Sequence, residues 1–295
     1  MKKFVILIPI YNDWKSLLKL IEQIDLEISE WNSNVSIFII NDASTEKRPL
    51  NELTLKNIKS IKVINMKNNL GHARCYAAGL KFLTEKEDFD YVILMDGDGE
   101  DRPNELNLLF QKIKENPSKT VTANRIKRSE GMIFKLMYEF HKILTYVFTG
   151  KLIKFGNYGC LPKESAVKLV QHASIWSSYS GTLTKVIDNR VSIPSFRGAR
   201  YFGPSQMNFF NLLIHSFSII AVFKGSVVFR SILFIFFYLF FVFNNLTFIT
   251  LIPILLIVIF LFTILKISSR ENIHQLNNSL KNIRSIDNLS DFNSR

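Results

Sequence analysis

The chain has 295 residues, 47% of them apolar, and its 37 Lys and Arg against 25 Asp and Glu give a formal net charge of +12. This composition excludes a disordered chain and a collagen-like repeat. The two cysteines, Cys75 and Cys160, are too few for a disulfide scaffold or a zinc site, and they favour a reducing compartment for the polar part of the chain.

The first two thirds of the chain alternate between short apolar runs and helical patterns. The runs are rich in Val and Ile and predict strands at 4–8, 35–40, 61–65, 91–95 and 120–123. Helices are predicted between them, at 14–28, 73–83 and 103–114. This alternation predicts an α/β domain with a mostly parallel sheet and helices on both faces. In such a sheet ligands bind beyond the carboxyl ends of the strands, so functional residues should directly follow the strands.

Four segments rich in polar residues or glycine follow the first four predicted strands: PIYND, NDAST, NLGHARCYAAGL and MDGDGEDRP. None is a dinucleotide or P-loop fingerprint. In the last segment Asp96 and Asp98 are two residues apart, and carboxylates so placed can hold one Mg²⁺ or Mn²⁺ that neutralises a departing diphosphate. Taken alone, the pattern also fits a solvated turn in which Asp101 caps a helix that begins near Pro103.

Together, in order, these segments resemble the "P-x-Y-N-E", "D-D-G-S-T", "N-x-G-x-x-x-A-x-x-x-G" and "D-x-D" motifs of glycosyltransferase family 2. The resemblance covers about residues 4–207. It continues through Arg125-Ile126-Lys127-Arg128, the expected turn Gly156-Asn157-Tyr158 and RGARYFGPSQM, which look like the polyprenyl-phosphate branch with dolichol-phosphate mannose synthase and bacterial undecaprenyl-phosphate sugar synthases. It implies the nucleotide-diphospho-sugar transferase (GT-A) fold.

The resemblance also implies roles for individual residues. The nucleotide sugar would be bound by Pro9, Tyr11, Asp13, Asp42, Gly71, Arg74 and Asp96. The metal would be held by Asp96, Asp98 and Glu100, and catalysis would depend on Asp98, Asp101, Arg125 and Arg128. The acceptor phosphate would be bound by Arg125, Arg128, Arg197, Arg200 and Ser205. Without the resemblance, these residues have simpler interpretations. Arg74 could be a surface residue of a helix, and His72 could be a polar residue at the start of that helix. The four arginines of the acceptor site could contact anionic lipid headgroups.

Two positions depart from the family pattern. Asn41 takes the place of the first Asp of the second motif, which leaves Asp42 as the main candidate there. Gly159 takes the place of an Arg in the "G-D-F-R-L" segment of the polyprenyl-phosphate branch, and this loss weakens the expectation of a phosphate acceptor.

The segment Ser231–Leu265 contains no charged residue and no histidine. As one helix it would measure about 52 Å, against about 30 Å for a hydrocarbon layer. Asn244-Asn245 lies near its middle, so we expect a hairpin of two spans, Val227–Phe243 and Leu246–Leu265, with Pro253 kinking the second. The alternative is a buried helical hairpin of a soluble protein.

Basic residues flank the hairpin at both ends, and its turn carries no charge. By the positive-inside rule both ends are expected in the cytoplasm, in keeping with a bacterial inner membrane protein. We therefore predict a cytoplasmic GT-A domain (1–205), an interfacial helix (206–226), which could instead pack on the domain, a transmembrane hairpin (227–266) and a polar tail (267–295). In the tail one short amphipathic helix is expected, from Ile273 to Ile283, followed by disorder.

The predicted function is that of an inverting, membrane-bound hexosyltransferase that moves a sugar from a nucleotide-diphosphate sugar to a polyprenyl phosphate. The alternative acceptor is a hydroxyl of a lipid-linked glycan in surface-polysaccharide assembly. A hydroxyl needs a general base, and between Cys160 and Arg200 the only carboxylates are Glu164 and Asp188, neither in a typical catalytic pair. A non-catalytic partner is disfavoured by the retained Asp96 and Asp98. The net charge suits membrane lipids and phosphates, no motif indicates nucleic acid, and homo-oligomerisation stays open.

Overall fold

The computed structural model describes residues 1–47, 53–127, 132–203 and 209–289. Its centre is an eight-stranded sheet in the order β7-β5-β6-β4-β1-β2-β3-β8. The strands are β1 (Lys2–Ile10), β2 (Ser33–Asn41), β3 (Ile58–Met66), β4 (Tyr91–Leu94), β5 (Thr120–Lys127), β6 (Phe155–Pro162), β7 (Arg190–Phe196) and β8 (Ile283–Asn288).

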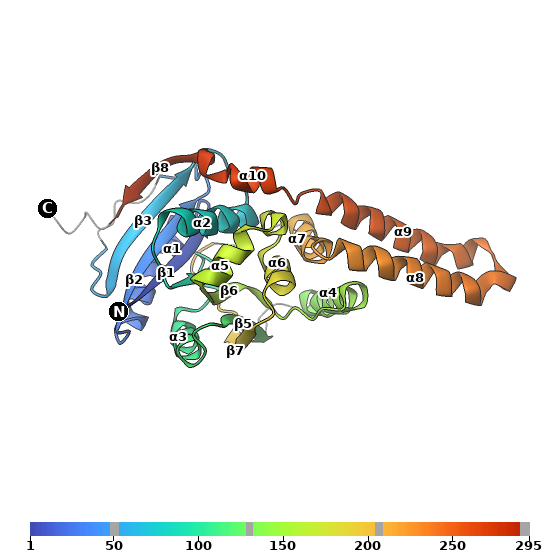
Figure 1. The fold of residues 1–295 in the computed structure, drawn as a ribbon, viewed down its shortest axis with the longest axis horizontal. Helices are drawn as coiled ribbons and strands as arrows, with labels where there is room; N and C mark the ends of the chain where they lie inside the picture. The colour runs from blue at the N-terminus through green and yellow to red at the C-terminus, as the bar shows by residue number, and fades with distance from the viewer. Residues whose placement is uncertain (48–52, 128–131, 204–208, 290–295) are drawn as a thin grey trace.

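Helices cover both faces of the sheet and extend away from it at one end (Figure 1). The α-helices are α1 (Trp14–Glu27), α2 (His72–Lys86), α3 (Leu106–Glu115), α4 (Met132–Thr149), α5 (Lys163–Val170), α6 (Tyr179–Val186), α7 (Phe209–Ala221), α8 (Lys224–Val242), α9 (Phe248–Ser268) and α10 (Ile273–Asn277). The 3₁₀ turns are η1 (Pro103–Glu105), η2 (Ala173–Trp176), η3 (Phe243–Asn245) and η4 (Ser279–Asn282).

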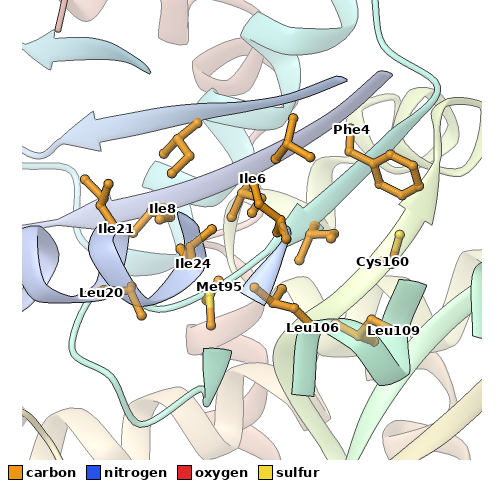
Figure 2. Close-up of a cluster of buried hydrophobic side chains, with 14 of the residues drawn as sticks. Phe4, Ile6, Ile8, Leu20, Ile21, Ile24, Met95, Leu106, Leu109 and Cys160 are labelled. Carbon is orange, nitrogen blue, oxygen red and sulfur yellow. The ribbon is translucent and has the colours of Figure 1, made fainter. Parts of the chain in front are cut away.

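Two hydrophobic cores lie on opposite faces of the sheet. Alternate residues of β1 enter each of them: Ile6 and Ile8 pack under α1 and α3, as Figure 2 shows, while Val5 and Leu7 pack under α2, α5 and α6. Because this central strand is buried on both faces, its sequence is almost continuously apolar, which is why it is readable as a strand.

The predicted α/β fold with a mostly parallel sheet is confirmed. The five predicted strands are β1 to β5 and the three predicted helices are α1, α2 and η1 with α3. Strands β4, β1, β2 and β3 are parallel, whereas β6 is inserted antiparallel between β4 and β5. The expectation of a turn at Gly156-Asn157-Tyr158 is wrong, because these residues lie inside β6.

The hairpin has the predicted form, with α8 and α9 joined by η3 at Asn244-Asn245. Both helices are long and apolar enough to cross a membrane, and their most apolar windows are only 11% and 6% buried. They project from the domain side by side (Figure 1). This exposure argues against a buried core hairpin, which would hide its apolar side chains within the protein.

Helices α4 and α7 lie at the base of the hairpin. Phe148 of α4, Ile220 of α7, Val227 of α8 and Ile264 of α9 belong to one apolar cluster. Most of the segment expected as an interfacial helix forms α7, and one face of α7 packs on this cluster. Arg230 of α8 donates to the last turn of α4, where cations offset unpaired carbonyl groups.

The segment after the hairpin differs from the expected one. The helix α10 ends at Asn277, and Ile283 begins strand β8, which pairs antiparallel with β3. Polar residues obscure the apolar–polar alternation by which this short strand could have been recognised. Its pairing with β3 supplies hydrogen-bond partners to an edge of the sheet that would otherwise be open. Both ends of the hairpin therefore lie at the domain, in agreement with the arrangement of the flanking charges.

Candidate active site

Four carboxylates crowd the loop after β4, those of Asp96, Asp98, Glu100 and Asp101. The backbone N–H of Glu100 donates to Asp98 (3.0 Å), and that of Asp96 donates to the carboxylate of Asp101 (3.0 Å), which is 6% exposed. Burial, followed by the neighbouring charge of Asp96, raises the pKa of Asp98 to about 6 and that of Asp101 to about 8. Both carboxyl groups are therefore harder to ionise than in water, chiefly because they are buried and secondly because Asp96 lies near them.

Asp96 is held by two side chains of α2. The Nε2 atom of His72 lies 2.9 Å from Asp96 Oδ1, and the hydroxyl of Tyr76 donates to the same oxygen at 2.7 Å. Desolvation opposes the charge on each partner, but their mutual attraction prevails: the pKa of His72 is raised and that of Asp96 is lowered. Sequence reasoning missed this pair. The spacing of His72 and Tyr76, four residues apart on one helix, was the available signal.

Arg197 and Arg200, expected at the acceptor phosphate, contact the same acidic loop. Arg200 bridges Asp98 (2.8 Å) and Asp13 (2.5 Å), and Arg197 pairs with Glu100. The side chains of Arg200, Asp98 and Asp13 are only 15%, 17% and 18% exposed. In this structure two predicted acceptor residues are the counter-ions of two predicted metal ligands.

The two loops also meet through their backbones. The N–H of Tyr201 donates to the carbonyl of Asp98 (3.0 Å), and that of Gly198 donates to the carbonyl of Glu100 (2.8 Å). Gly99 has a φ of +88°, and a Cβ there would lie 2.6 Å from the Tyr201 ring. Glycine is thus required at position 99 both for its left-handed backbone and for this close approach.

The loop before α2 is fixed by Asp42. Its two carboxylate oxygens accept the backbone N–H groups of Leu70 (2.7 Å) and Gly71 (2.8 Å), and its side chain is buried. The expected contact of Asp42 with the nucleotide sugar thus competes with these two bonds. Asn41, at the position that departs from the family pattern, donates to Asn65 instead.

The remaining candidates for the nucleotide site lie around this loop. Pro9 is buried inside β1, whereas Tyr11 is 42% exposed directly after that strand. Gly71 precedes α2 with open space beside its Cα. Arg74 lies with its guanidinium 5.5 Å from the centre of the Trp176 ring, and its Nε atom is buried with no hydrogen-bond partner in the described part of the chain.

Arg125 lies at the end of β5, beside the acidic loop. Its guanidinium packs over Gly156, where an added Cβ would lie 2.7 Å from it, and its charge acts on Asp96 and Asp101. At Gly159 a Cβ would lie 2.6 Å from the carbonyl of Val121, so this backbone has no room for the family's arginine. Arg128 and Ser205, also expected at the acceptor, lie outside the described residues.

Helix α7, which packs at the base of the hairpin, lies near the site. Desolvation lowers the pKa of His215 on α7 to about 4, and the positive charges of His72 and Arg125 add to this effect. Arg270, which follows α9, acts similarly on Arg74: after desolvation, its charge is the second cause of that group's lowered pKa. Residues on both sides of the hairpin therefore lie within electrostatic range of the groups that follow β3, β4 and β5.

The acidic loop fits a hard divalent cation by its donor chemistry. Asp96, Asp98 and Glu100 offer carboxylate oxygens, and a bound cation would favour the ionised form of Asp98, whose pKa is raised by burial and then by the charge of Asp96. In the described ranges these side chains are not gathered about one point as a three-ligand cluster. To bind the cation, Asp98 and Glu100 would have to release Arg200 and Arg197.

The mostly parallel sheet, with an acidic loop at the end of β4, has the arrangement of a GT-A-type fold. The family model "Glycosyl transferase family 2" matches residues 5–168, and the chain belongs to this family. It is 25% identical over 218 residues to the undecaprenyl-phosphate 4-deoxy-4-formamido-L-arabinose transferase of Klebsiella pneumoniae (strain 342). This match covers 72% of the chain but only 64% of the relative.

Solved structures with the same fold include glucosyl-3-phosphoglycerate synthase from Mycobacterium tuberculosis. Its complex with Mn²⁺, UDP-glucose and phosphoglyceric acid has a TM-score of 0.55 at 12% identity, with 77% of this chain and 80% of that chain covered. Its complex with Mg²⁺ and UDP has a TM-score of 0.53 at 13% identity, with 77% and 79% covered.

Proposed function

We propose that the protein is a membrane-anchored, inverting glycosyltransferase that moves a sugar from a nucleotide-diphosphate sugar to a polyprenyl phosphate. The observation that carries the proposal is that α7, whose His215 lies near Arg125 and Asp96, packs at the base of an exposed apolar hairpin. A lipid-borne acceptor would reach this end of the sheet directly from the membrane. The named activity of the Klebsiella relative supports the same acceptor class.

The donor would lie between the loop before α2 and the acidic loop. Asp96, Asp98 and Glu100 would hold Mg²⁺ or Mn²⁺, which supplies positive charge at the donor diphosphate. The solved neighbours contain the same ions with UDP. His72 and Tyr76 hold one oxygen of Asp96 in place, and the unpartnered Nε of Arg74 offers a donor for a diphosphate oxygen.

In the reaction an acceptor phosphate oxygen would attack the anomeric carbon while the bond from that carbon to the nucleotide diphosphate breaks. The attacking oxygen is already anionic, so no residue needs to remove a proton. Arg125 would hold the phosphate by its fork of N–H donors. Asp101 is buried and bonded to the Asp96 amide, and this limits its use as a base for a hydroxyl acceptor.

Two substitutions separate the phosphate acceptor from the hydroxyl acceptor. Membranes with each variant would receive a panel of radiolabelled nucleotide sugars, and the lipid phase would be tested for a product labile to mild acid. For a phosphate acceptor, Arg125→Ala should lower kcat/KM for the acceptor by about 30-fold or more, because a charged group loses its hydrogen-bonded partner. Arg284→Ala, on an exposed residue of β8, is the matched control.

For a hydroxyl acceptor the order reverses. Asp101→Asn would then be the severe change, since the base is lost, and Arg125→Ala would have little effect. An active Arg125→Ala enzyme together with an inactive Asp101→Asn enzyme would overturn the phosphate acceptor in favour of a lipid-linked glycan.

A further inference from the structure

The segment that follows the hairpin, residues 269–289 and here called the strap, runs along α2 and then along the edge of the sheet (Figure 1). It is anchored in the core of the domain. Leu276 is fully buried among residues of α2 and η2, and Leu280 and Ile283 pack against the same core. The strap is thus part of the catalytic domain, although the hairpin separates it from the rest of that domain along the chain.

The strap is hydrogen-bonded to the loop Lys67–Gly71, which connects β3 to α2. The amide side chains of Asn68 and Asn282 face each other: Asn68 Nδ2 donates to Asn282 Oδ1 (3.0 Å), and Asn282 Nδ2 donates to the Asn68 carbonyl (3.1 Å). The backbone N–H of Lys67 also donates to the Asn282 carbonyl (2.7 Å). One residue of the strap therefore makes three hydrogen bonds to two successive loop residues.

The same loop is held from its other side by Asp42, through Leu70 and Gly71. The loop thus lies between a carboxylate that follows β2 and an amide that comes from the strap. Gly71 ends the loop, and His72, which holds Asp96, begins α2. Any movement of the loop would move the start of this helix relative to the acidic loop.

A second contact joins the strap to the donor side of the site. Trp176 Nε1 donates to Gln275 Oε1 (2.8 Å), and the ring of Trp176 lies under the guanidinium of Arg74. Arg74, in the proposed donor site, is therefore separated from Gln275 of the strap by one intervening side chain, that of Trp176.

We propose that Asn282 is a positioning residue: through Asn68 it fixes the loop Lys67–Gly71, and so the start of α2, at the distance from the acidic loop that donor binding requires. The idea that this loop binds the donor rests on the proposed function. The idea that Asn282 holds this loop in place rests on the hydrogen bonds described above. The two parts are tested by different readouts.

The test compares Asn282→Ala with Asn288→Ala in the full-length protein in detergent. Asn288 lies at the far end of β8, the strand that directly follows Asn282, and it pairs with Lys62 through the backbone, away from the loop, so its substitution is the matched control. Amide hydrogen exchange is measured by mass spectrometry. For Asn282→Ala we expect exchange at Leu70 and Gly71 to be about tenfold faster, which corresponds to about 1.4 kcal/mol and to the loss of two hydrogen bonds. Exchange in β1 and α1 should not change.

The same variants are then assayed with the nucleotide sugar that the wild-type protein transfers. Asn282→Ala should raise the KM for that donor by about tenfold with little change in kcat. Asn282→Asp keeps the acceptor for Asn68 Nδ2 and loses the donor to the Asn68 carbonyl, so its KM and exchange rates should be intermediate.

Unchanged exchange at Leu70 and Gly71 would overturn the proposal, and so would faster exchange with an unchanged donor KM. Faster exchange throughout the domain would show a general loss of stability and would also overturn it. If the wild-type protein transfers sugar from no nucleotide sugar, the proposed function fails, and the local exchange data alone decide whether Asn282 holds the loop.

Discussion

Removal of the Arg200 side chain should destabilise the protein and, at the same time, strengthen its response to a divalent cation. Arg200 is the shared partner of Asp98 and Asp13, and all three side chains are at most 18% exposed. Arg200→Ala leaves two largely buried carboxylates without a cation. Loss of one partner of a buried pair costs about 3–5 kcal/mol, and the residual solvent contact here argues for about 2–3 kcal/mol.

For a domain of this size, each kcal/mol lowers Tm by about 2–4 °C, so Arg200→Ala should lower the Tm of the metal-free protein by roughly 5–10 °C. In the wild-type protein a cation must displace the guanidinium from Asp98, whereas in the variant it need not. If this tightens Mn²⁺ binding about tenfold, the Mn²⁺-bound variant regains about 1.4 kcal/mol more than the wild-type protein does.

The assay is thermal unfolding in detergent with chelator and with a series of Mn²⁺ concentrations. Arg190→Ala is the control, because Arg190 donates to the carbonyls of Leu183 and Ile187 and not to the acidic loop. It should lower Tm and leave the gain from Mn²⁺ as in the wild-type protein. If Mn²⁺ raises the Tm of the wild-type and Arg200→Ala proteins equally, Arg200 does not compete with the cation for Asp98, and the reasoning is refuted.

Three further predictions concern catalysis, pH and topology. Asp98→Asn should lower sugar transfer about 10²-fold or more, because charge on the leaving diphosphate loses its stabilisation; full transfer in excess chelator would contradict this. Asp101 has a pKa raised to about 8, so the stability that it contributes is complete below about pH 4 and is lost as the pH rises through 8. The Tm of Asp101→Asn relative to the wild-type protein should therefore increase from pH 5 to pH 8.5. A Tm difference that does not change with pH would show that ionisation of this carboxyl group does not destabilise the fold. In intact cells an impermeant thiol reagent should label Asn245→Cys and spare Arg284→Cys, and the opposite pattern would reverse the proposed orientation.

The parts of the fold that burial dictates could be predicted from the sequence. Strands β1 to β5 read as short runs of Val and Ile because the sheet is covered on both faces. Strands β6 and β7 could not be recognised so easily. Gly156 and Gly159 interrupt β6, and Pro194 lies in β7, where it is tolerated because β7 is an edge strand. Strand β8 was missed because it follows the hairpin and lies at the other edge.

The candidate site could be predicted as a set of loops but not as a set of contacts. The motifs located the acidic loop and the loop before α2, because both follow strands. They could not show that Arg200 meets Asp98, since that pairing depends on how two loops about a hundred residues apart pack on each other. The His72–Asp96 contact also depends on this packing, although the helical spacing of His72 and Tyr76 hinted at it.

The pairing of β8 with β3 also has a consequence for the order of events during synthesis. The partner residues, such as Ile64 and Ile286, are separated along the chain by everything from α2 to the end of the hairpin. Chains fold from the amino terminus as they are made, so β3 must wait with an unpaired edge until both helices of the hairpin have been synthesised. The sheet is completed only after that step, and an enzyme whose hairpin is misplaced would be left with an open strand edge, a surface that quality-control proteases and chaperones can recognise.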